Sequence, residues 1–197
     1  MRSSAITSFG RSDYSDVDPE ERVLSIVVMG VSGAGKSTVG NMLARELDFT
    51  FCDADSLHPP ENVERMAAGY PLGDVERWPW LEAVGRYLAD SRTANRGTVM
   101  ACSALKHSYR DALRRHVPDA FFVFLDGPMS VVHQRIDGRN HEFMPPTLLA
   151  SQYLSLEPLA EDERGIRVDI EESPVRIVDT VRSAVAAAAI PPALRDR

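Results

Sequence analysis

The sequence predicts an α/β fold in which a five-stranded parallel sheet is covered by helices on both faces. Five short runs rich in β-branched and aromatic residues alternate with longer stretches whose apolar residues recur at helical spacing. Each short run is continuously apolar rather than alternating, which is typical of strands buried on both faces. The expected strands are residues 23–29, 49–52, 98–102, 121–125 and 166–170.

Helices are expected between these strands, because prolines, glycines and the spacing of apolar residues mark their limits. Pro59 or Pro60 can open a helix that Gly69 ends, and Pro191 and Pro192 follow the last helix. The expected helices are residues 37–47, 59–69, 79–91, 107–115 and 174–189, with one more beginning near Pro128.

Length and composition indicate one soluble globular domain. The chain has 197 residues, of which 44% are hydrophobic and 26% charged. Its net charge of −7 provides no global positive field for nucleic acid or an anionic membrane. Only two cysteines are present, Cys52 and Cys102, and no apolar run is long enough for a signal peptide or a membrane span. We therefore expect a cytoplasmic protein that binds neither nucleic acid nor membrane, with tails at residues 1–21 and 191–197 around a domain at 22–190.

A phosphate-binding loop follows the first expected strand. Residues 30–37 match the pattern G-x-x-x-x-G-K-[ST] and lead into a helix, which is the context that this pattern requires. The glycines let several backbone N–H groups face one anion, Lys36 can reach the β- and γ-phosphates, and Ser37 can bind Mg²⁺. The residues expected to bind nucleotide are Gly30, Ser32, Gly33, Ala34, Gly35, Lys36, Ser37 and Thr38.

Acidic and basic residues follow the next two strands, at the sheet edge where parallel folds bind ligands. Asp53 and Asp55 are two residues apart, so an extended chain places both carboxylates on one side, where one can hold a Mg²⁺-bound water and the other can accept a proton. The alternative is a turn or a helix cap. Ser103, Lys106 and Arg110 suit Mg²⁺-bound water and an anionic ligand, unless Ser103 caps a helix and the two cations are solvated.

A pair of arginines precedes a segment that is typical of a mobile flap, residues 138–146. Arg135 and Arg139 are four residues apart on a predicted helix and therefore project from one face. On a closing flap they would neutralise charge on a transferred phosphoryl group, whereas the alternative is a solvated helix face.

Taken together, these motifs make the sequence resemble the gluconokinase family of small P-loop carbohydrate kinases over about residues 23–186. The resemblance rests on these segments: MGVSGAGKST (29–38), DADSLHPPENVERMAAGYPL (53–72), RWPWL (77–81), ACSALKHSYRDALR (101–114), the flap, and SQYLSLEP (151–158). Two positions depart from the family's pattern. Glu76 stands where members often have Asp, and His141-Glu142 replaces a Gly-His pair before Phe143.

The resemblance implies a P-loop NTPase three-layer α/β/α sandwich, similar to adenylate and shikimate kinases, with a mobile lid at about residues 136–147. It implies transfer of the γ-phosphate of ATP to the 6-hydroxyl of D-gluconate with Mg²⁺, feeding the pentose phosphate pathway, and a homodimer. It identifies Asp55 as the base for the sugar hydroxyl, so that, with the motifs above, the expected catalytic residues are Lys36, Asp55, Arg135 and Arg139. It assigns gluconate binding to Asp55, His58, Arg65, Lys106 and Arg110. The expected metal site combines Ser37 with Asp53 and Ser103, the last two acting through water.

Two other functions remain open at this stage. One is a kinase of the same fold for another small acceptor, such as shikimate or a nucleoside monophosphate. The other is a non-catalytic module that binds ATP to regulate a partner. Contacts to adenine are expected from residues 171–174.

Overall fold

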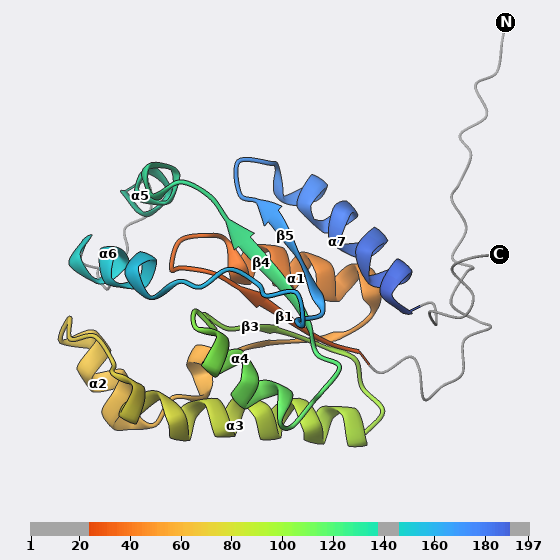
Figure 1. Cartoon of the computed structure of the whole chain (residues 1–197), viewed down its shortest axis with the longest axis horizontal. Helices are drawn as coiled ribbons and strands as arrows, with labels where there is room; N and C mark the ends of the chain where they lie inside the picture. Colours follow the sequence, from red (N-terminus) through yellow and green to blue (C-terminus); the bar gives the residue numbers. More distant parts are fainter. Residues whose placement is uncertain (1–23, 138–145, 190–197) are drawn as a thin grey trace, which may run out of the picture.

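The computed structural model describes residues 24–137 and 146–189 (Figure 1). The predicted tails at residues 1–21 and 191–197, most of the predicted lid, and both Arg139 and His141 lie outside the described residues.

The predicted parallel sheet is confirmed. Its strands are β1 (Ser25–Met29), β2 (Thr50–Asp53), β3 (Thr98–Ala101), β4 (Phe121–Asp126) and β5 (Gly165–Asp169). All neighbouring strands are parallel, in the order β2-β3-β1-β4-β5. This order puts β1, and the phosphate-binding loop that follows it, at the centre of the sheet.

Helices cover both faces, as predicted (Figure 1). Alternate residues of β1 point to opposite faces. Ile26 and Val28 are buried beneath α1 (Lys36–Leu47) and α7 (Pro174–Ala189). Val27 and Met29 are buried on the other side, beneath α3 (Asp74–Thr93) and α4 (His107–Arg114). The continuous apolar run of β1 is thus explained by two cores, one on each face of the sheet, whereas the edge strands β2 and β5 are only partly buried.

Helix α3 begins at Asp74, five residues before the predicted start, so this prediction was wrong. The backbone N–H of Gly73 donates to Glu76 Oε2 at 2.9 Å, and the N–H of Arg77 donates to Gly73 O at 3.2 Å. A glutamate that reaches back to the residue before the helix stabilises its first turn, which places Pro79 inside the helix rather than at its start. The longer side chain of Glu76 therefore has a structural use.

Four short elements lie at the end of the molecule toward which the strands run (Figure 1). They are the 3₁₀ helix η2 (Ala54–Leu57), α2 (Pro60–Ala67), α5 (Met129–Asp137) and α6 (Pro146–Ser155). Helix α2 begins at a proline and is followed by Gly69 in the left-handed conformation, as the sequence predicts. Helix α6 was not predicted.

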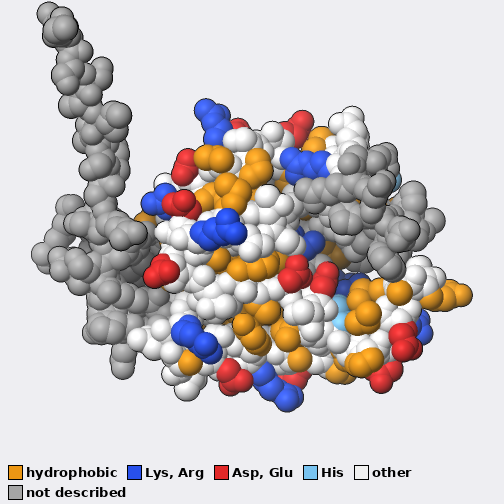
Figure 2. All heavy atoms as spheres, turned by 180° about the vertical axis from the view of Figure 1, so that it is seen from behind, with side chains coloured by type: hydrophobic (Ala, Val, Ile, Leu, Met, Phe, Trp, Pro, Cys, Tyr) orange, Lys and Arg blue, Asp and Glu red, His pale blue; other side chains and the backbone are white. Residues whose placement is uncertain are grey.

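Figure 2 shows the face opposite to that of Figure 1, where apolar side chains gather at the corner formed by α2 and the first turns of α3. The exposed large apolar residues there are Val63, Tyr70, Val75 and Trp78. Within the two described ranges, no helix is long and apolar enough to cross a membrane.

Candidate active site

The loop between β1 and α1 is shaped for a close approach to its neighbours. Gly30 has φ +136°, and a Cβ there would lie 2.7 Å from the carbonyl oxygen of Leu125. Gly33 has φ +81°, and a Cβ there would lie 2.7 Å from Cγ1 of Ile136. Because other residues rarely adopt these φ values and would collide here, the two glycines fix the path of the loop against β4 and α5.

The N-terminus of α1 is open to an anion. In the described part of the chain, no side chain caps this helix, and its first turn contains no acidic residue. Ser37 and Thr38 are exposed in that turn. The N–H groups of a first helical turn have no partner within the helix, and together with the helix dipole they bind phosphate. The predicted nucleotide-binding residues therefore form a site that fits phosphate groups.

Lys36 lies between the loop and two carboxylates. Its Nζ donates to the carbonyl oxygen of Val31 at 3.0 Å. Burial lowers the pKa of the Lys36 ammonium, while the nearby Asp55 and Asp53 act to raise this pKa. The lysine is thus held where a terminal phosphate and an acidic catalytic group would meet.

Asp53 acts both as a helix cap and as a neighbour of the phosphate loop. Its Oδ1 accepts a hydrogen bond from the N–H of Asp55 at 3.1 Å, and its Oδ2 accepts one from the Ser37 hydroxyl at 2.8 Å. The chain turns into η2 at Ala54, so the expectation that both carboxylates extend from one side of an extended strand was wrong. They still face the same site, because both act on Lys36.

These oxygen atoms fit the chemistry of Mg²⁺. The ion prefers oxygen ligands and is commonly bound by one or two carboxylates together with substrate phosphates. Ser37 and Asp53 supply a hydroxyl and a carboxylate that already contact each other. The described residues contain no cluster of three or more acidic, histidine or cysteine side chains suited to a metal. Ser103 lies at the same place, since its carbonyl oxygen accepts the Gly30 N–H at 3.2 Å.

Asp55 stands at the mouth of this site with 76% of its side chain exposed. Desolvation is the largest effect on the pKa of its carboxyl and raises this pKa, as does the negative charge of Asp53. The positive charges of Lys36 and Arg77 act in the opposite direction, and the net effect is an increase. Because most of the side chain contacts water, screening limits the size of this shift. The Asp55 carboxyl therefore holds a proton more tightly than that of an ordinary aspartate.

His58 supports Asp55 as a neutral ring. It stacks on Trp80 with 4.2 Å between ring centroids, and its side chain is only 2% exposed. Burial, together with the positive charge of Arg77, lowers the pKa of His58 to about 4. Its Nε2 lies 4.0 Å from Asp55 Oδ1. At neutral pH, His58 can contribute a hydrogen bond to a substrate but not a positive charge.

Farther from the phosphate loop, Lys106 and Tyr109 both donate hydrogen bonds to Oδ1 of Asp74, the first of them at 2.8 Å. The hydrogen bond from Lys106 lowers the pKa of Asp74, and the same bond raises the pKa of Lys106. Lys106, a predicted substrate residue, is therefore already paired with a carboxylate.

Arg77 is the functional candidate that sequence reasoning missed. Its Nε donates to the carbonyl oxygen of Leu72 at 3.2 Å, and its Cζ lies 5.8 Å from the centroid of the Tyr109 ring. Desolvation raises the pKa of Asp55 and of Tyr109, and the positive charge of Arg77 acts to lower both. The same charge also contributes to the lowered pKa of Asp74, so this arginine lies among the three groups. The available signal was its place in RWPWL, three residues after Asp74 and thus on the same helix face.

Arg110 does not fit the predicted role in substrate binding. Its side chain is fully buried and donates to both carboxylate oxygens of Glu163, at 2.6 and 2.8 Å. It also donates to four backbone carbonyls, those of Ala104, Leu105, Glu157 and Pro158. All of its nitrogens are engaged within the protein, so this arginine fixes the loop before α4 and leaves no donor for a ligand. Arg65, by contrast, is exposed on α2.

Removing the partner of Arg110 is expected to destabilise the protein. Glu163→Gln leaves a buried guanidinium without its counter-charge, which costs about 3 kcal/mol of unfolding free energy. Burial acts to raise the pKa of Glu163, but the hydrogen bonds from Arg110 and Ala160 outweigh it and lower this pKa. The stability from this pair is thus present above the unfolded-state pKa of the glutamate and is lost as the pH falls through the lower folded-state pKa.

Urea unfolding of Glu163→Gln, with Glu161→Gln as an exposed control, measures this cost. Equal stability of both variants at neutral pH would show that Arg110 needs no counter-charge.

Two further side chains contact the phosphate loop. Arg135 donates to the carbonyl oxygen of Ala34 at 3.1 Å and also to that of Ile170. Gln152 on α6 accepts a hydrogen bond from the N–H of Ser32 at 2.7 Å. Arg135 was predicted, and it lies where it could meet a nucleotide, whereas Gln152 was not singled out.

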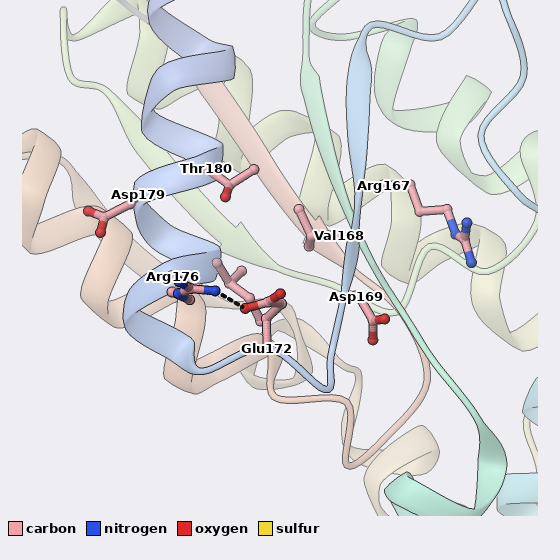
Figure 3. A pocket seen from close by; sticks show the side chains of 8 residues that line it. Arg167, Val168, Asp169, Glu172, Arg176, Asp179 and Thr180 are labelled. Atoms are coloured by element: carbon pink, nitrogen blue, oxygen red, sulfur yellow. Dashed lines mark hydrogen bonds and ion pairs between the residues drawn. The ribbon is translucent and has the colours of Figure 1, made fainter.

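A separate hollow of about 410 Å³ lies beside the connection from β5 to α7 (Figure 3). Charged side chains of both signs line it, and Arg176 and Glu172 form an ion pair of 3.5 Å across part of it. Glu172 belongs to the segment from which adenine contacts were expected. The lining includes no residue of the phosphate loop, so we assign the hollow no part in the reaction.

Comparisons with known sequences agree with this site. The family model described as "Shikimate kinase" matches residues 32–185. A gluconokinase from Gluconobacter oxydans (strain 621H) is 45% identical over 149 residues, which cover 76% of this chain and 84% of that protein. The thermosensitive gluconokinase of Escherichia coli (strain K12) is 38% identical over 164 residues, covering 83% and 88%.

Solved structures show the same relationship. A gluconokinase from Sinorhizobium meliloti 1021 superposes with a TM-score of 0.77 at 44% identity, covering 84% of this chain and 93% of that chain. Shikimate kinase from Aquifex aeolicus vf5 has a TM-score of 0.51 at 20% identity, covering 84% and 98%, and shares the fold. The chain therefore belongs to the gluconokinases, within the shikimate kinase family of P-loop proteins.

Proposed function

We propose that this protein is a gluconokinase that transfers the γ-phosphate of ATP to the 6-hydroxyl of D-gluconate, giving 6-phospho-D-gluconate and ADP. The observation that carries the proposal is the line of charged groups leading from Lys36 through Asp55 to Arg77. Desolvation raises the pKa of Asp55, and the positive charges of Lys36 and Arg77 both act to lower it, so Asp55 lies within reach of both cations. A phosphate cradle lies at one end of this line and a cation at the other. This arrangement suits an acceptor with a hydroxyl at one end and a carboxylate at the other.

Each group has a defined task in the transfer. The first-turn N–H groups of α1 and the ammonium of Lys36 hold the phosphates and stabilise charge on the transferred group. Asp55 accepts the proton of the attacking hydroxyl. Ser37, with Asp53 through a water, would hold Mg²⁺, which when bound neutralises phosphate charge. Arg135 would contact the nucleotide from the side of α5, and we propose the same kind of role for Arg139.

Arg77 is the best candidate for the gluconate carboxylate. A guanidinium can bind a carboxylate with two parallel hydrogen bonds. Among the described residues, the hydrogen bond from Arg77 Nε to Leu72 is the one found for this side chain, so its two terminal nitrogens remain for a ligand. Lys106, Arg65 and His58 would contact the hydroxyl groups or the carboxylate beside it. Ser103 would act through a metal-bound water.

Gluconate is favoured over shikimate by the relatives. Proteins named as gluconokinases are 36 to 45% identical to this chain, whereas the shikimate kinase structure is 20% identical. The test is release of ADP from Mg²⁺-ATP with D-gluconate, shikimate, AMP, other sugar acids and no acceptor. Turnover confined to gluconate supports the proposal. ATP binding without turnover on any acceptor would favour a regulatory module instead.

Removing Arg77 is expected to impair acceptor binding selectively. Arg77→Ala should raise KM for gluconate roughly 10- to 100-fold, because a charge-assisted hydrogen bond contributes about 1.5–3 kcal/mol. KM for ATP should stay within about twofold, since binding of nucleotide does not involve this side chain. Steady-state kinetics measure both values, with Arg86→Ala on the exposed face of the same helix as control. An unchanged gluconate KM would remove Arg77 from the acceptor site.

Two further proposals concern the protein as a whole. We propose a homodimer, as the family resemblance implies, which light scattering of the purified protein tests directly. We also propose a cytoplasmic location, because Cys52 and Cys102 are both free thiols and suit a reducing compartment.

A further inference from the structure

Gln152 joins two parts of the chain that lie 120 residues apart. Its Oε1 accepts a hydrogen bond of 2.7 Å from the backbone N–H of Ser32, in the limb of the phosphate loop that precedes Gly33. The side chain is half-buried. It belongs to the segment SQYLSLEP, which no role assigned above has used.

Helix α6 holds Gln152 in a fixed place. On one side of it, Leu149 is completely buried in the core shared with α1 and α7. On the other side, the hydroxyl of Tyr153 donates to the carbonyl oxygen of Gly127 at 3.0 Å, and the N–H of Glu157 donates to that of Leu105 at 2.8 Å. Because the helix is anchored on both sides of Gln152, the contact with Ser32 is preset by the fold.

The phosphate loop needs such a support. Ser32 lies between Gly30 and Gly33, both in the left-handed region of φ, where the backbone has little resistance to rotation. Residues on both sides of Ser32 are held by other groups, since Val31 O accepts from Lys36 and Ala34 O accepts from Arg135. Neither of these contacts involves the N–H of Ser32. The hydrogen bond from Ser32 to Gln152 therefore fixes this part of the loop.

The chemistry of a carboxamide adds a second role. Its oxygen is used by Ser32, and its nitrogen retains two N–H donors and no charge. The first-turn N–H groups of α1 bind the inner phosphates of a nucleotide. Because Oε1 is bonded to Ser32, Nε2 of the same carboxamide also lies beside the phosphate loop, where a donor can bind a phosphate oxygen and a carboxylate would be repelled.

We propose that Gln152 positions the phosphate loop through its bond to Ser32 and donates a hydrogen bond from Nε2 to the terminal phosphate of bound ATP. This inference rests on the proposed use of ATP but not on the identity of the acceptor. It predicts that Gln152 distinguishes ATP from ADP.

Calorimetric binding of Mg²⁺-ATP and Mg²⁺-ADP, without acceptor, tests the donor role. Gln152→Ala is expected to raise Kd for ATP about tenfold, the loss of one such hydrogen bond, and Kd for ADP clearly less. Gln152→Glu should weaken ATP binding at least as much, because a carboxylate lacks the donor. Gln134→Ala, an exposed glutamine on α5, should match the wild type. Wild-type ATP binding by Gln152→Glu, or equal losses for ATP and ADP in Gln152→Ala, would overturn the donor role.

Hydrogen exchange of the Ser32 N–H, followed by NMR in the nucleotide-free protein, tests the positioning role. The exchange should become faster in Gln152→Ala and stay close to the wild-type rate in Gln152→Glu, which keeps an acceptor oxygen. An unchanged rate in Gln152→Ala would overturn this role. None of these measurements contains gluconate, so they fail or succeed independently of the proposed acceptor. Absence of ATP binding by the wild type would instead refute the use of ATP.

Discussion

Lys36→Ala is expected to lower kcat roughly a thousandfold, which is the scale of loss for a cation or donor that stabilises a transferred phosphoryl group. The Lys36 ammonium is held over the loop by Val31 and lies beside Asp55 and Asp53. Its amino group is therefore already in place before substrate binds and needs no reorganisation when charge develops. Alanine retains the helix and the backbone N–H groups, so nucleotide binding should weaken less than catalysis.

Single-turnover and steady-state kinetics of Lys36→Ala measure this loss. Arg45→Ala, which removes an exposed cation from the same helix, controls for a general change in charge. Thermal unfolding should show that both variants remain folded, because Lys36 makes one side-chain hydrogen bond, to a loop carbonyl. A kcat within tenfold of the wild type would exclude Lys36 from stabilising the transferred group.

Asp55→Asn is expected to lower kcat by about a thousandfold, within the range for loss of a general base. The amide cannot accept the proton of the attacking hydroxyl but has almost the same shape. Desolvation is the largest effect on the pKa of Asp55 and raises it. The wild-type kcat/KM should therefore fall as the pH is lowered through a pKa above that of an ordinary aspartate, since only the deprotonated form acts as a base.

The pH profile of the variant separates Asp55 from its neighbour. His58 has a pKa of about 4, so a decline in activity caused by this histidine would persist in Asp55→Asn. We expect the acidic limb assigned to Asp55 to disappear from the residual activity, while Asp90→Asn, at an exposed position on α3, keeps the wild-type profile. Near-normal turnover by Asp55→Asn would remove it as the base.

The phosphate loop and the carboxylates could be predicted because their information is local. The spacing of Gly30, Gly35 and Lys36 after an apolar run specifies both the loop and its place at the end of a strand. Asp53 and Asp55 follow the next strand, and parallel strands end at the same edge of a sheet. The sequence predicted an extended chain at this pair, which was wrong, but both residues still lie in the site because the chain turns only after the strand has ended.

The cations could not be sorted by sequence. Arg110 and Arg77 are both arginines near the start of a helix. The spacing of residues does not reveal that Arg110 forms a buried ion pair with Glu163, which lies 53 residues away. Tertiary packing makes Arg110 structural and leaves Arg77 among the polar groups of the site. Gln152 was missed for the same reason, because its partner Ser32 lies 120 residues away and α6 carried no strong start signal beyond Pro146.

Phosphorus NMR of a reaction containing enzyme, Mg²⁺-ATP and D-gluconate tests the central claim most directly, because it identifies the transfer and the position of the new ester together. We expect the γ-phosphate signal to be replaced by one phosphomonoester signal split into a triplet by the two protons on carbon 6. A doublet, which a secondary hydroxyl gives, would contradict the proposed position. An unchanged γ-phosphate signal, or inorganic phosphate as the only product, would contradict gluconate phosphorylation itself.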